Sequence, residues 1–302
     1  MDNTIVVANT NIYKLPFPFE PVTITRFADG EIRPFVEGDV AGKKVIYIAS
    51  MYPVPSDIIL EWLLTIDAIK RKSAVAITAV VPYMPYIRQS KVHRNGESRS
   101  AEVVSRILSS SGVDTIITFD LHNDSAISFF TRLAEDGESR RAVPVVHLSA
   151  LSLLPPLVTC DAHTIVVSPD EGSALRARSA SELLHVPLVV LTKKRSLVAG
   201  DTVEELVFHD DVSGKSAIII DDIISTGTTI AKAAKLLKDH GCTKIIVFAV
   251  HAVFAGDAKR LLEETAIDQL IVTDTIPRSV SDLPKGTEIV SIRPLLEQAI
   301  TG

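Results

Sequence analysis

Two adjacent carboxylates stand between an apolar run and a turn rich in hydroxyl groups in residues 217–229, Ala-Ile-Ile-Ile-Asp-Asp-Ile-Ile-Ser-Thr-Gly-Thr-Thr. We expect Asp221 and Asp222 at the tip of a strand over 217–220, placed to bind two neighbouring hydroxyls of a sugar. The turn can aim backbone N–H groups and hydroxyls at one phosphate, and a following helix adds the positive end of its dipole. An ordinary strand–turn–helix unit is the alternative, but adjacent acids are costly to bury without a partner. The predicted phosphate-binding turn comprises Ser225, Thr226, Gly227, Thr228 and Thr229.

Two other segments of the second half carry charged residues directly after an apolar run. Residues 168–178 follow one such run and open a helix, so Gly172 and nearby amides could approach a diphosphate closely. Arg176 and Arg178 in this segment are interpreted as solvated helix charges. Residues 192–196, Thr-Lys-Lys-Arg-Ser, precede a stretch that reads as a mobile loop. Three consecutive basic residues are often only a solvated surface, but their place after a core strand favours a functional role.

Three segments of the first half have residues suited to nucleotide binding. Residues 26–32 hold an Asp-Gly pair, which alone would predict a surface turn. Prolines in 82–90 would project Arg88 and Gln89 from a rigid loop, where an arginine fork can pair with phosphate and an amide can read a base edge. His122 follows the apolar run 115–119 and lies beside acids, a better position for function than that of a lone structural histidine.

The elements that would position these residues alternate between strands and helices. Helical spacing of apolar residues predicts helices over 57–70, 101–110 and 230–240. Such alternation predicts an α/β protein with mainly parallel sheets flanked by helices. The two halves share a weak similarity, since each has a strand that ends in a polar loop, after residue 119 and after residue 220. This similarity predicts two similar domains, 1–146 and 147–302. The strands are expected within 4–8, 45–49, 74–81, 115–119, 143–147, 164–167, 186–191, 217–220, 245–250 and 270–273.

Composition limits the class of protein. The net charge of −6 argues against a general nucleic-acid binder. The longest apolar run, 245–255, is interrupted by His251 and is too short to span a bilayer, and the N-terminus does not read as a signal peptide. Cys160 and Cys242 are far apart without metal-binding spacing, so a reducing cytoplasm is the expected compartment.

The turn at 221–229 resembles the phosphoribosyl diphosphate-binding motif of type I phosphoribosyltransferases and of ribose-phosphate pyrophosphokinases. The segments at 26–32, 82–90, 119–124, 168–178 and 192–196 resemble the pyrophosphokinases in particular, and the likeness spans roughly residues 20–255. It implies two phosphoribosyltransferase-like domains, the first on the ATP side and the second on the ribose 5-phosphate side. Whether the last helix, 293–300, packs on the first domain is left open.

The resemblance also implies roles for single residues. His122 and Asp170 would hold Mg²⁺, while Lys193, Arg195 and His122 would be catalytic. Asp221 and Asp222, with the turn 225–229, would bind ribose 5-phosphate. The residues implied in ATP binding are Phe27, Asp29, Glu31, Arg88, Gln89 and His122.

The implied reaction moves the β,γ-diphosphoryl group of Mg-ATP to the C1 hydroxyl of ribose 5-phosphate and releases AMP. The family builds its ATP site between subunits, so the resemblance implies a homodimer or a larger homo-oligomer, without nucleic-acid or membrane partners. The sequence departs from the common family pattern at Ser90, His93 and Ser173, where Asp, Asp and Gly are expected. These departures leave the nucleotide donor and any phosphate or ADP control open. The alternatives are a non-catalytic or regulatory paralogue and a type I phosphoribosyltransferase.

Overall fold

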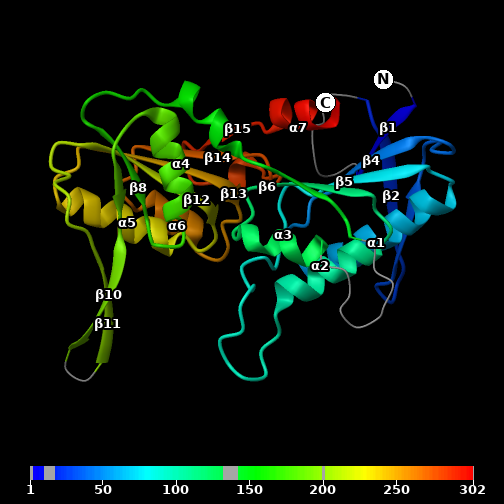
Figure 1. The fold of residues 1–302 in the computed structure, drawn as a ribbon, viewed down its shortest axis with the longest axis horizontal. Coiled ribbons are helices and arrows are strands. Elements are labelled where there is room, and N and C mark those ends of the chain that lie inside the picture. Colours follow the sequence, from blue (N-terminus) through cyan, green and yellow to red (C-terminus); the bar gives the residue numbers. More distant parts are fainter. Residues whose placement is uncertain (1–2, 10–17, 132–141, 199–200, 302) are drawn as a thin grey trace. The chain divides into compact units, whose positions relative to one another are not determined.

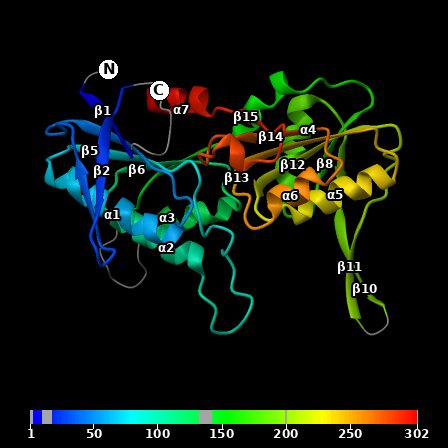
Figure 2. The ribbon, with the colours of Figure 1, turned by 180° about the vertical axis from the view of Figure 1, so that it is seen from behind.

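The structure is a computed structural model that describes residues 3–9, 18–131, 142–198 and 201–301, with side chains except at Asp124, 193–205 and Thr301. The chain divides into two compact units between Leu148 and Ser149. We call them unit 1 and unit 2 and describe each by itself. Figures 1 and 2 show both as sheets with flanking helices.

Unit 1 is built on a seven-stranded sheet in the order β3-β2-β1-β4-β5-β6-β7. Every neighbouring pair is parallel except β2 and β3, which form an antiparallel hairpin. The mainly parallel arrangement confirms the predicted sheet type. The strands are β1 (Thr4–Asn9), β2 (Glu20–Arg26), β3 (Ile32–Val36), β4 (Lys44–Ile48), β5 (Ala76–Val80), β6 (Thr115–Phe119) and β7 (Val145–Leu148).

The helices of unit 1 lie on one side of its strands in both ribbon views (Figures 1 and 2). Apolar residues at helical spacing, such as Trp62 and Ile66 of α1 and Leu108 of α2, pack into one core with the strands. This core fixes the strand ends from which the polar loops of unit 1 emerge. The helices are α1 (Pro55–Arg71), α2 (Ser100–Ser110), the short turn η1 (Asp124–Ala126) and α3 (Ile127–Thr131).

Unit 2 is built on a six-stranded, fully parallel sheet in the order β15-β14-β13-β12-β8-β9. Along the chain, β9 is added on one side of β8, and β12 is then added on the opposite side of β8. The strand order therefore reverses between β8 and β12, and ligands of open α/β sheets bind at such a point. The strands are β8 (Thr164–Ser168), β9 (Leu188–Val190), β12 (Ser216–Ile224), β13 (Lys244–Ala252), β14 (Gln269–Thr273) and β15 (Glu288–Val290).

Helices cover both faces of the unit 2 sheet, as Figure 1 shows for α4 on one side and α5 and α6 on the other. Alternate residues of β12 enter two cores: Ile219 packs with α5 and α6, and Ile220 with α4. Burial on both faces explains why this strand reads as an unbroken apolar run. The helices are α4 (Ala174–Leu184), α5 (Thr228–Asp239), α6 (Ala258–Glu263), α7 (Arg293–Thr301) and the short turns η2 (Ala150–Leu153), η3 (Pro155–Leu157) and η4 (Val280–Asp282).

Two hairpins were not expected from the sequence. The β2–β3 pair lies at the edge of its sheet, and its prolines and exposed polar residues interrupt the apolar pattern from which a strand would be predicted. The basic segment 192–196 belongs to an antiparallel ribbon of β10 (Thr192–Val198) and β11 (Asp201–Val207), which also includes described residues of the stretch interpreted as a mobile loop. Within the described residues, no helix is both long enough and apolar enough to span a membrane.

Candidate active site

The turn after β12 has the form expected of a phosphate-binding loop. Gly227 precedes α5 with φ of 76°, a left-handed conformation that glycine adopts without strain. A Cβ there would lie 3.1 Å from Leu262 Cγ, so a larger residue would also crowd α6. Thr226 and Thr228 lie with their hydroxyl oxygens 3.2 Å apart at the start of the helix. Amides, hydroxyls and the helix dipole therefore converge where an anion would bind.

Backbone contacts from the next loop hold this turn in place. Phe254 N donates to Ile224 O at 2.9 Å, and Ala255 N donates to Ser225 O at the same distance. Phe254 is buried and has a positive φ of 44°, which is uncommon for a bulky residue. Sequence reasoning missed this supporting loop because no polar side chain marks it.

Asp221 and Asp222 lie inside β12 and not at its tip, because the strand continues to Ile224. Its neighbour β13 extends alongside, with Asp221 opposite Ala249 and Ile223 opposite His251. The predicted end of the strand at 220 was therefore wrong: Ile223 and Ile224 extend the apolar run past the acids. Both carboxylates are buried as a result, with Asp222 only 2% exposed.

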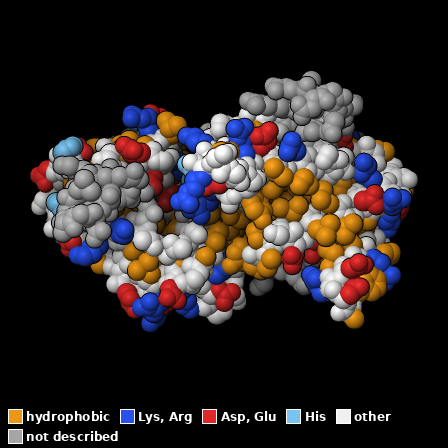
Figure 3. Space-filling view, turned by 90° about the horizontal axis from the view of Figure 1, so that it is seen from below, with side chains coloured by type: hydrophobic (Ala, Val, Ile, Leu, Met, Phe, Trp, Pro, Cys, Tyr) orange, Lys and Arg blue, Asp and Glu red, His pale blue; other side chains and the backbone are white. Residues whose placement is uncertain are grey.

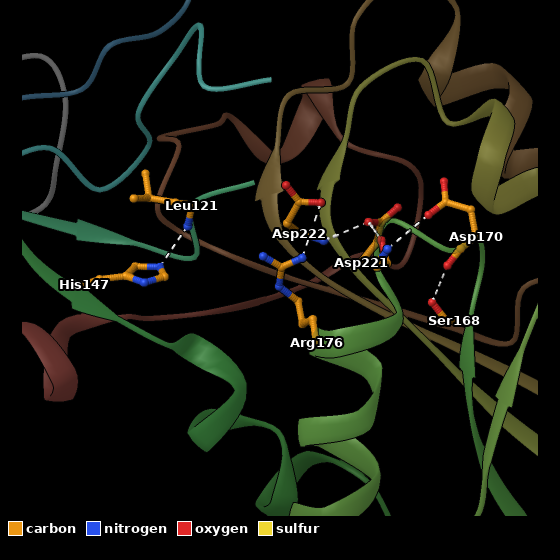
Figure 4. A network of polar contacts seen from close by, with 8 residues as sticks. Leu121, His147, Ser168, Asp170, Arg176, Asp221 and Asp222 are labelled. Atoms are coloured by element: carbon orange, nitrogen blue, oxygen red, sulfur yellow. Dashed lines mark hydrogen bonds and ion pairs between the residues drawn. The ribbon is translucent and has the colours of Figure 1, made fainter. Parts of the chain in front are cut away.

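Each buried acid has a partner from the start of α4 (Figure 4). The Ser173 hydroxyl donates to Asp221 Oδ1 at 2.7 Å, and Arg176 Nη1 lies 3.6 Å from Asp222 Oδ1. Asp222 N also donates to Asp221 Oδ1 at 2.9 Å. The interpretation of Arg176 as a solvated charge was wrong, since its side chain is only 14% exposed and forms an ion pair with Asp222. Its position three residues after Ser173, on the same side of the helix, was the available clue.

Burial and the neighbouring charge of Asp222 raise the pKa of Asp221 to about 7, while the hydrogen bond from Ser173 acts in the opposite direction. Asp170 adds a further repulsive charge. Asp170, Asp221 and Asp222 thus concentrate negative charge near the carboxyl end of β8, with Arg176 paired to Asp222. Such a concentration of negative charge is suited to hydroxyl donors or a cation.

We expect Asp221→Asn to raise the melting temperature by an amount that increases with pH. Well below the unfolded pKa of about 3.9 the carboxyl is protonated in both the unfolded and folded states, so its ionisation costs nothing. The cost accumulates as pH rises and is complete above the folded pKa of about 7. A shift of one pKa unit corresponds to about 1.4 kcal/mol, so we expect at least that stabilisation at pH 8.

Thermal unfolding of both proteins from pH 4 to pH 8 measures this effect. Asp161→Asn is the control of opposite sign, because hydrogen bonds from the Thr164 hydroxyl and from His163 N lower the pKa of the exposed Asp161. Its stabilising effect is present above the unfolded pKa and is lost as pH falls. A melting temperature of Asp221→Asn that exceeds wild type equally at all pH values would contradict the assignment.

The loop after β8 presents Asp170 beside these acids (Figure 4). Its Oδ1 accepts a hydrogen bond from Ser173 N at 3.1 Å, and its carbonyl accepts one from the buried Ser168 hydroxyl at 2.7 Å. Among the described side chains, no group of three His, Cys, Asp or Glu could hold a metal ion by itself. Proteins commonly bind Mg²⁺ through one or two carboxylates together with substrate phosphates, and Asp170 fits that mode.

In unit 1 the structure brings two of the predicted nucleotide-binding loops together. Arg88 and Gln89 are exposed and follow Tyr86, whose φ is 66°. Gln89 Oε1 accepts a hydrogen bond from the Ser100 hydroxyl at 2.6 Å, which anchors this loop to the start of α2. Asn123 Nδ2 donates to Ser90 Oγ at 3.2 Å and joins the loop to the segment that contains His122.

His122 is exposed on a tightly held turn after β6. Asp120, two residues before His122, is buried with a φ of 33°, a conformation that is sparsely populated outside glycine. The backbone N–H of Leu121 donates to His147 Nε2 at 2.9 Å (Figure 4). His147 therefore accepts through Nε2 and supports the turn, a role that sequence reasoning missed.

Phe27, Asp29 and Glu31 lie on the exposed turn between β2 and β3. Glu31 N donates to Asp29 Oδ1 at 3.1 Å, and Phe27 N donates to Glu31 O at 2.8 Å, so the turn is closed by its own bonds. The Arg33 guanidinium lies 5.2 Å from the centre of the Phe27 ring, within range of a cation–π contact. No hydrogen bond found among the described residues joins this turn to the loops at 88–90 and 122–123.

Lys193 and Arg195 lie on β10, where the backbone register pairs them with Leu206 and Glu204 of β11. Their side chains are outside the described part of the structure. The ribbon begins directly after Leu191, a fully buried residue that links β9 to β10. Its base is therefore anchored to the core of unit 2.

The comparison with solved structures defines the class of protein. The phosphoribosylpyrophosphate synthetase of Mycobacterium smegmatis matches with a TM-score of 0.86 and 34% identity, over 99% of this chain and 97% of that one. The fold is thus phosphoribosyltransferase-like, as predicted. Two family models also match: the N-terminal domain of ribose phosphate pyrophosphokinase over residues 6–112 and the phosphoribosyl synthetase-associated domain over residues 199–301.

Similar proteins of known name agree with this class. The ribose-phosphate pyrophosphokinase of Aquifex aeolicus is 36% identical over 280 residues, which cover 92% of this chain and 86% of that protein. Ribose-phosphate pyrophosphokinase 1 of Streptococcus mutans is 34% identical over 282 residues, 92% of this chain and 84% of that protein. The chain belongs to the ribose-phosphate pyrophosphokinase family.

Proposed function

We propose that the protein transfers the β,γ-diphosphoryl group of ATP to the C1 hydroxyl of ribose 5-phosphate, forming phosphoribosyl diphosphate and AMP. The observation that carries this proposal is the geometry at the β8–β12 reversal, where two buried, partnered carboxylates lie beside a glycine-containing anion loop. Membership of the pyrophosphokinase family supports diphosphoryl transfer over the phosphoribosyltransferase alternative.

The second unit would hold the sugar phosphate. The 5-phosphate would accept hydrogen bonds from the amides and hydroxyls of the turn 225–229, at the start of α5. Asp221 and Asp222 would accept hydrogen bonds from the ribose hydroxyls. Because Ser173 and Arg176 already fix these carboxylates, little ordering remains when the sugar binds.

The first unit would supply the nucleotide contacts. Arg88 would pair with ATP phosphates, Gln89 would read the base, and His122 would contact the phosphates from the neighbouring turn. The hydrogen bond between Asn123 and Ser90 supports a common site for these loops. The turn that carries Phe27, Asp29 and Glu31 would bind adenine in a neighbouring subunit.

In the proposed reaction, the C1 oxygen bonds to the β-phosphorus of ATP while the bond from that phosphorus to the α–β bridging oxygen breaks. AMP leaves and the hydroxyl proton is released. Phosphoryl transfer needs alignment and charge neutralisation more than covalent help. Lys193 and Arg195 would neutralise the charge that develops on the transferring group.

We assign Mg²⁺ to Asp170 on the sugar side and to His122 on the nucleotide side. The fit is supported by the Asp170 carboxylate, which adds its negative charge to that of the nearby acids Asp221 and Asp222, a repulsion that a cation would relieve. When bound, the ion would neutralise phosphate charge. The residues themselves would fix the position of the diphosphate.

We also propose a homodimer or larger homo-oligomer as the active form, in a cytoplasmic location. Apolar side chains gather on the face of the molecule seen in Figure 3. Each of two helices contributes a pair four residues apart, Leu60 and Leu64 on α1 and Val103 and Ile107 on α2, and all four are more than one third exposed. An apolar face of this kind supports self-association. A fully active monomer would contradict the shared ATP site.

The direct test incubates the purified protein with Mg²⁺, ATP and ribose 5-phosphate and follows AMP by chromatography. We expect AMP only when the sugar phosphate is present. AMP formation without the sugar phosphate would contradict the proposed acceptor. No AMP from ATP or from other nucleoside triphosphates would favour a non-catalytic paralogue, and Ser90 and His93 would then be the first positions to restore to aspartate.

A further inference from the structure

Ser173 occupies the N-cap of α4 but does not use its side chain to cap the helix. A serine at this position usually accepts a hydrogen bond from an N–H of the first turn. Here the hydroxyl instead donates to Asp221 Oδ1 at 2.7 Å, 48 residues further along the chain. Both side chains are buried, with Ser173 5% and Asp221 8% exposed. The Ser173 hydroxyl therefore hydrogen-bonds to Asp221 of β12 and does not cap α4.

The backbone of the same residue holds a second carboxylate. Ser173 N donates to Asp170 Oδ1 at 3.1 Å, and the Ser168 hydroxyl fixes the Asp170 carbonyl at 2.7 Å. Ser173 thus contacts the carboxylate of the β8 loop through its N–H and that of β12 through its side chain. These two segments lie on either side of the point where the strand order reverses.

The contact also fixes the orientation of Asp221. Two donors, Ser173 Oγ and Asp222 N, meet at its Oδ1 and determine the rotation of the carboxylate. One turn further along α4, Arg176 pairs with Asp222. A single helix start therefore positions both acids, one through a neutral hydroxyl and the other through a cation.

We propose that Ser173 is a positioning residue for ribose 5-phosphate, whose hydroxyl orients the Asp221 carboxylate toward the sugar hydroxyls. This inference rests on the proposed function and adds to it a residue that the family resemblance does not supply, because glycine is expected at this position. A glycine would keep the N–H bond to Asp170 but would leave Oδ1 of Asp221 without its hydroxyl donor.

The test is Ser173→Ala, which removes the hydroxyl and retains the backbone N–H that binds Asp170. Because the Asp221 carboxylate would then have to be ordered when the sugar binds, we expect the KM for ribose 5-phosphate to rise roughly tenfold, about 1.4 kcal/mol. The KM for ATP should change by less than about twofold. Calorimetric titration of ribose 5-phosphate in the absence of ATP should show the same loss of affinity, well below the melting temperature of the variant.

Ser179→Ala is the matched control, since that exposed serine lies on the same helix and its hydroxyl donates to the Leu175 carbonyl of its own helix. It should leave both KM values unchanged. Sugar affinity of Ser173→Ala equal to that of wild type would overturn the proposal, as would equal losses for sugar and ATP. Wild-type protein that neither binds the sugar nor forms AMP would instead overturn the proposed function, so the two failures are distinguishable.

Discussion

Replacing Lys193 or Arg195 by alanine is expected to lower turnover by at least roughly a hundredfold, the effect of removing one group that stabilises transition-state charge. The KM values for ATP and ribose 5-phosphate should change little, because neither residue belongs to the loops that we assign to ground-state binding. Steady-state rates of AMP formation measure the effect.

Lys194→Ala is the matched control for this pair. Lys194 carries the same charge, lies between the two residues on β10 and pairs in register with Glu205. We expect its turnover to remain within about threefold of wild type, because the proposal gives Lys194 no contact with the transferring group and a charge acts only weakly through water. Intact turnover in both the Lys193 and the Arg195 variants would contradict the catalytic assignment.

The second large effect is expected from Arg176→Met. Removing one partner of a buried ion pair typically costs about 3–5 kcal/mol, because the other charge is left without compensation. Asp222 would then lie beside Asp221 without the Arg176 guanidinium. We expect the free energy of unfolding at pH 7 to fall by about 3 kcal/mol, together with loss of sugar binding.

Denaturant unfolding of Arg176→Met and Arg178→Met provides the comparison. Arg178 is exposed on the same helix, so its replacement should change the free energy of unfolding by less than about 0.5 kcal/mol. Equal stabilities of the two variants would show that the 3.6 Å contact contributes nothing.

The mainly parallel sheets were predictable because strands buried on two faces leave unbroken apolar runs. β6 lies at the predicted residues, and β12 and β13 extend beyond them. The edge hairpin β2–β3 and the ribbon β10–β11 were not predictable in this way. Prolines or polar residues interrupt these segments, so no unbroken apolar run marks them, and pairing with a partner strand defines them.

The parts of the candidate site that consist of consecutive residues were predictable from the sequence. The parts that depend on packing between distant segments were missed. The loop 225–229 follows from its own sequence, because glycine and hydroxyl residues mark a strand-to-helix turn. Ser173 and Arg176 meet the two acids only because α4 packs beside β12. Likewise, the support of the His122 turn by His147 depends on pairing of β6 with β7.

The central claim is that both the β- and the γ-phosphoryl groups of ATP move together onto the sugar. Phosphorus NMR of the protein with Mg²⁺, ATP and ribose 5-phosphate tests it most directly. The account predicts that the β and γ resonances of ATP disappear together and are replaced by those of AMP and of a diphosphate ester on C1. Formation of ADP with a sugar bisphosphate, or of AMP with free diphosphate while ribose 5-phosphate is unchanged, would contradict it.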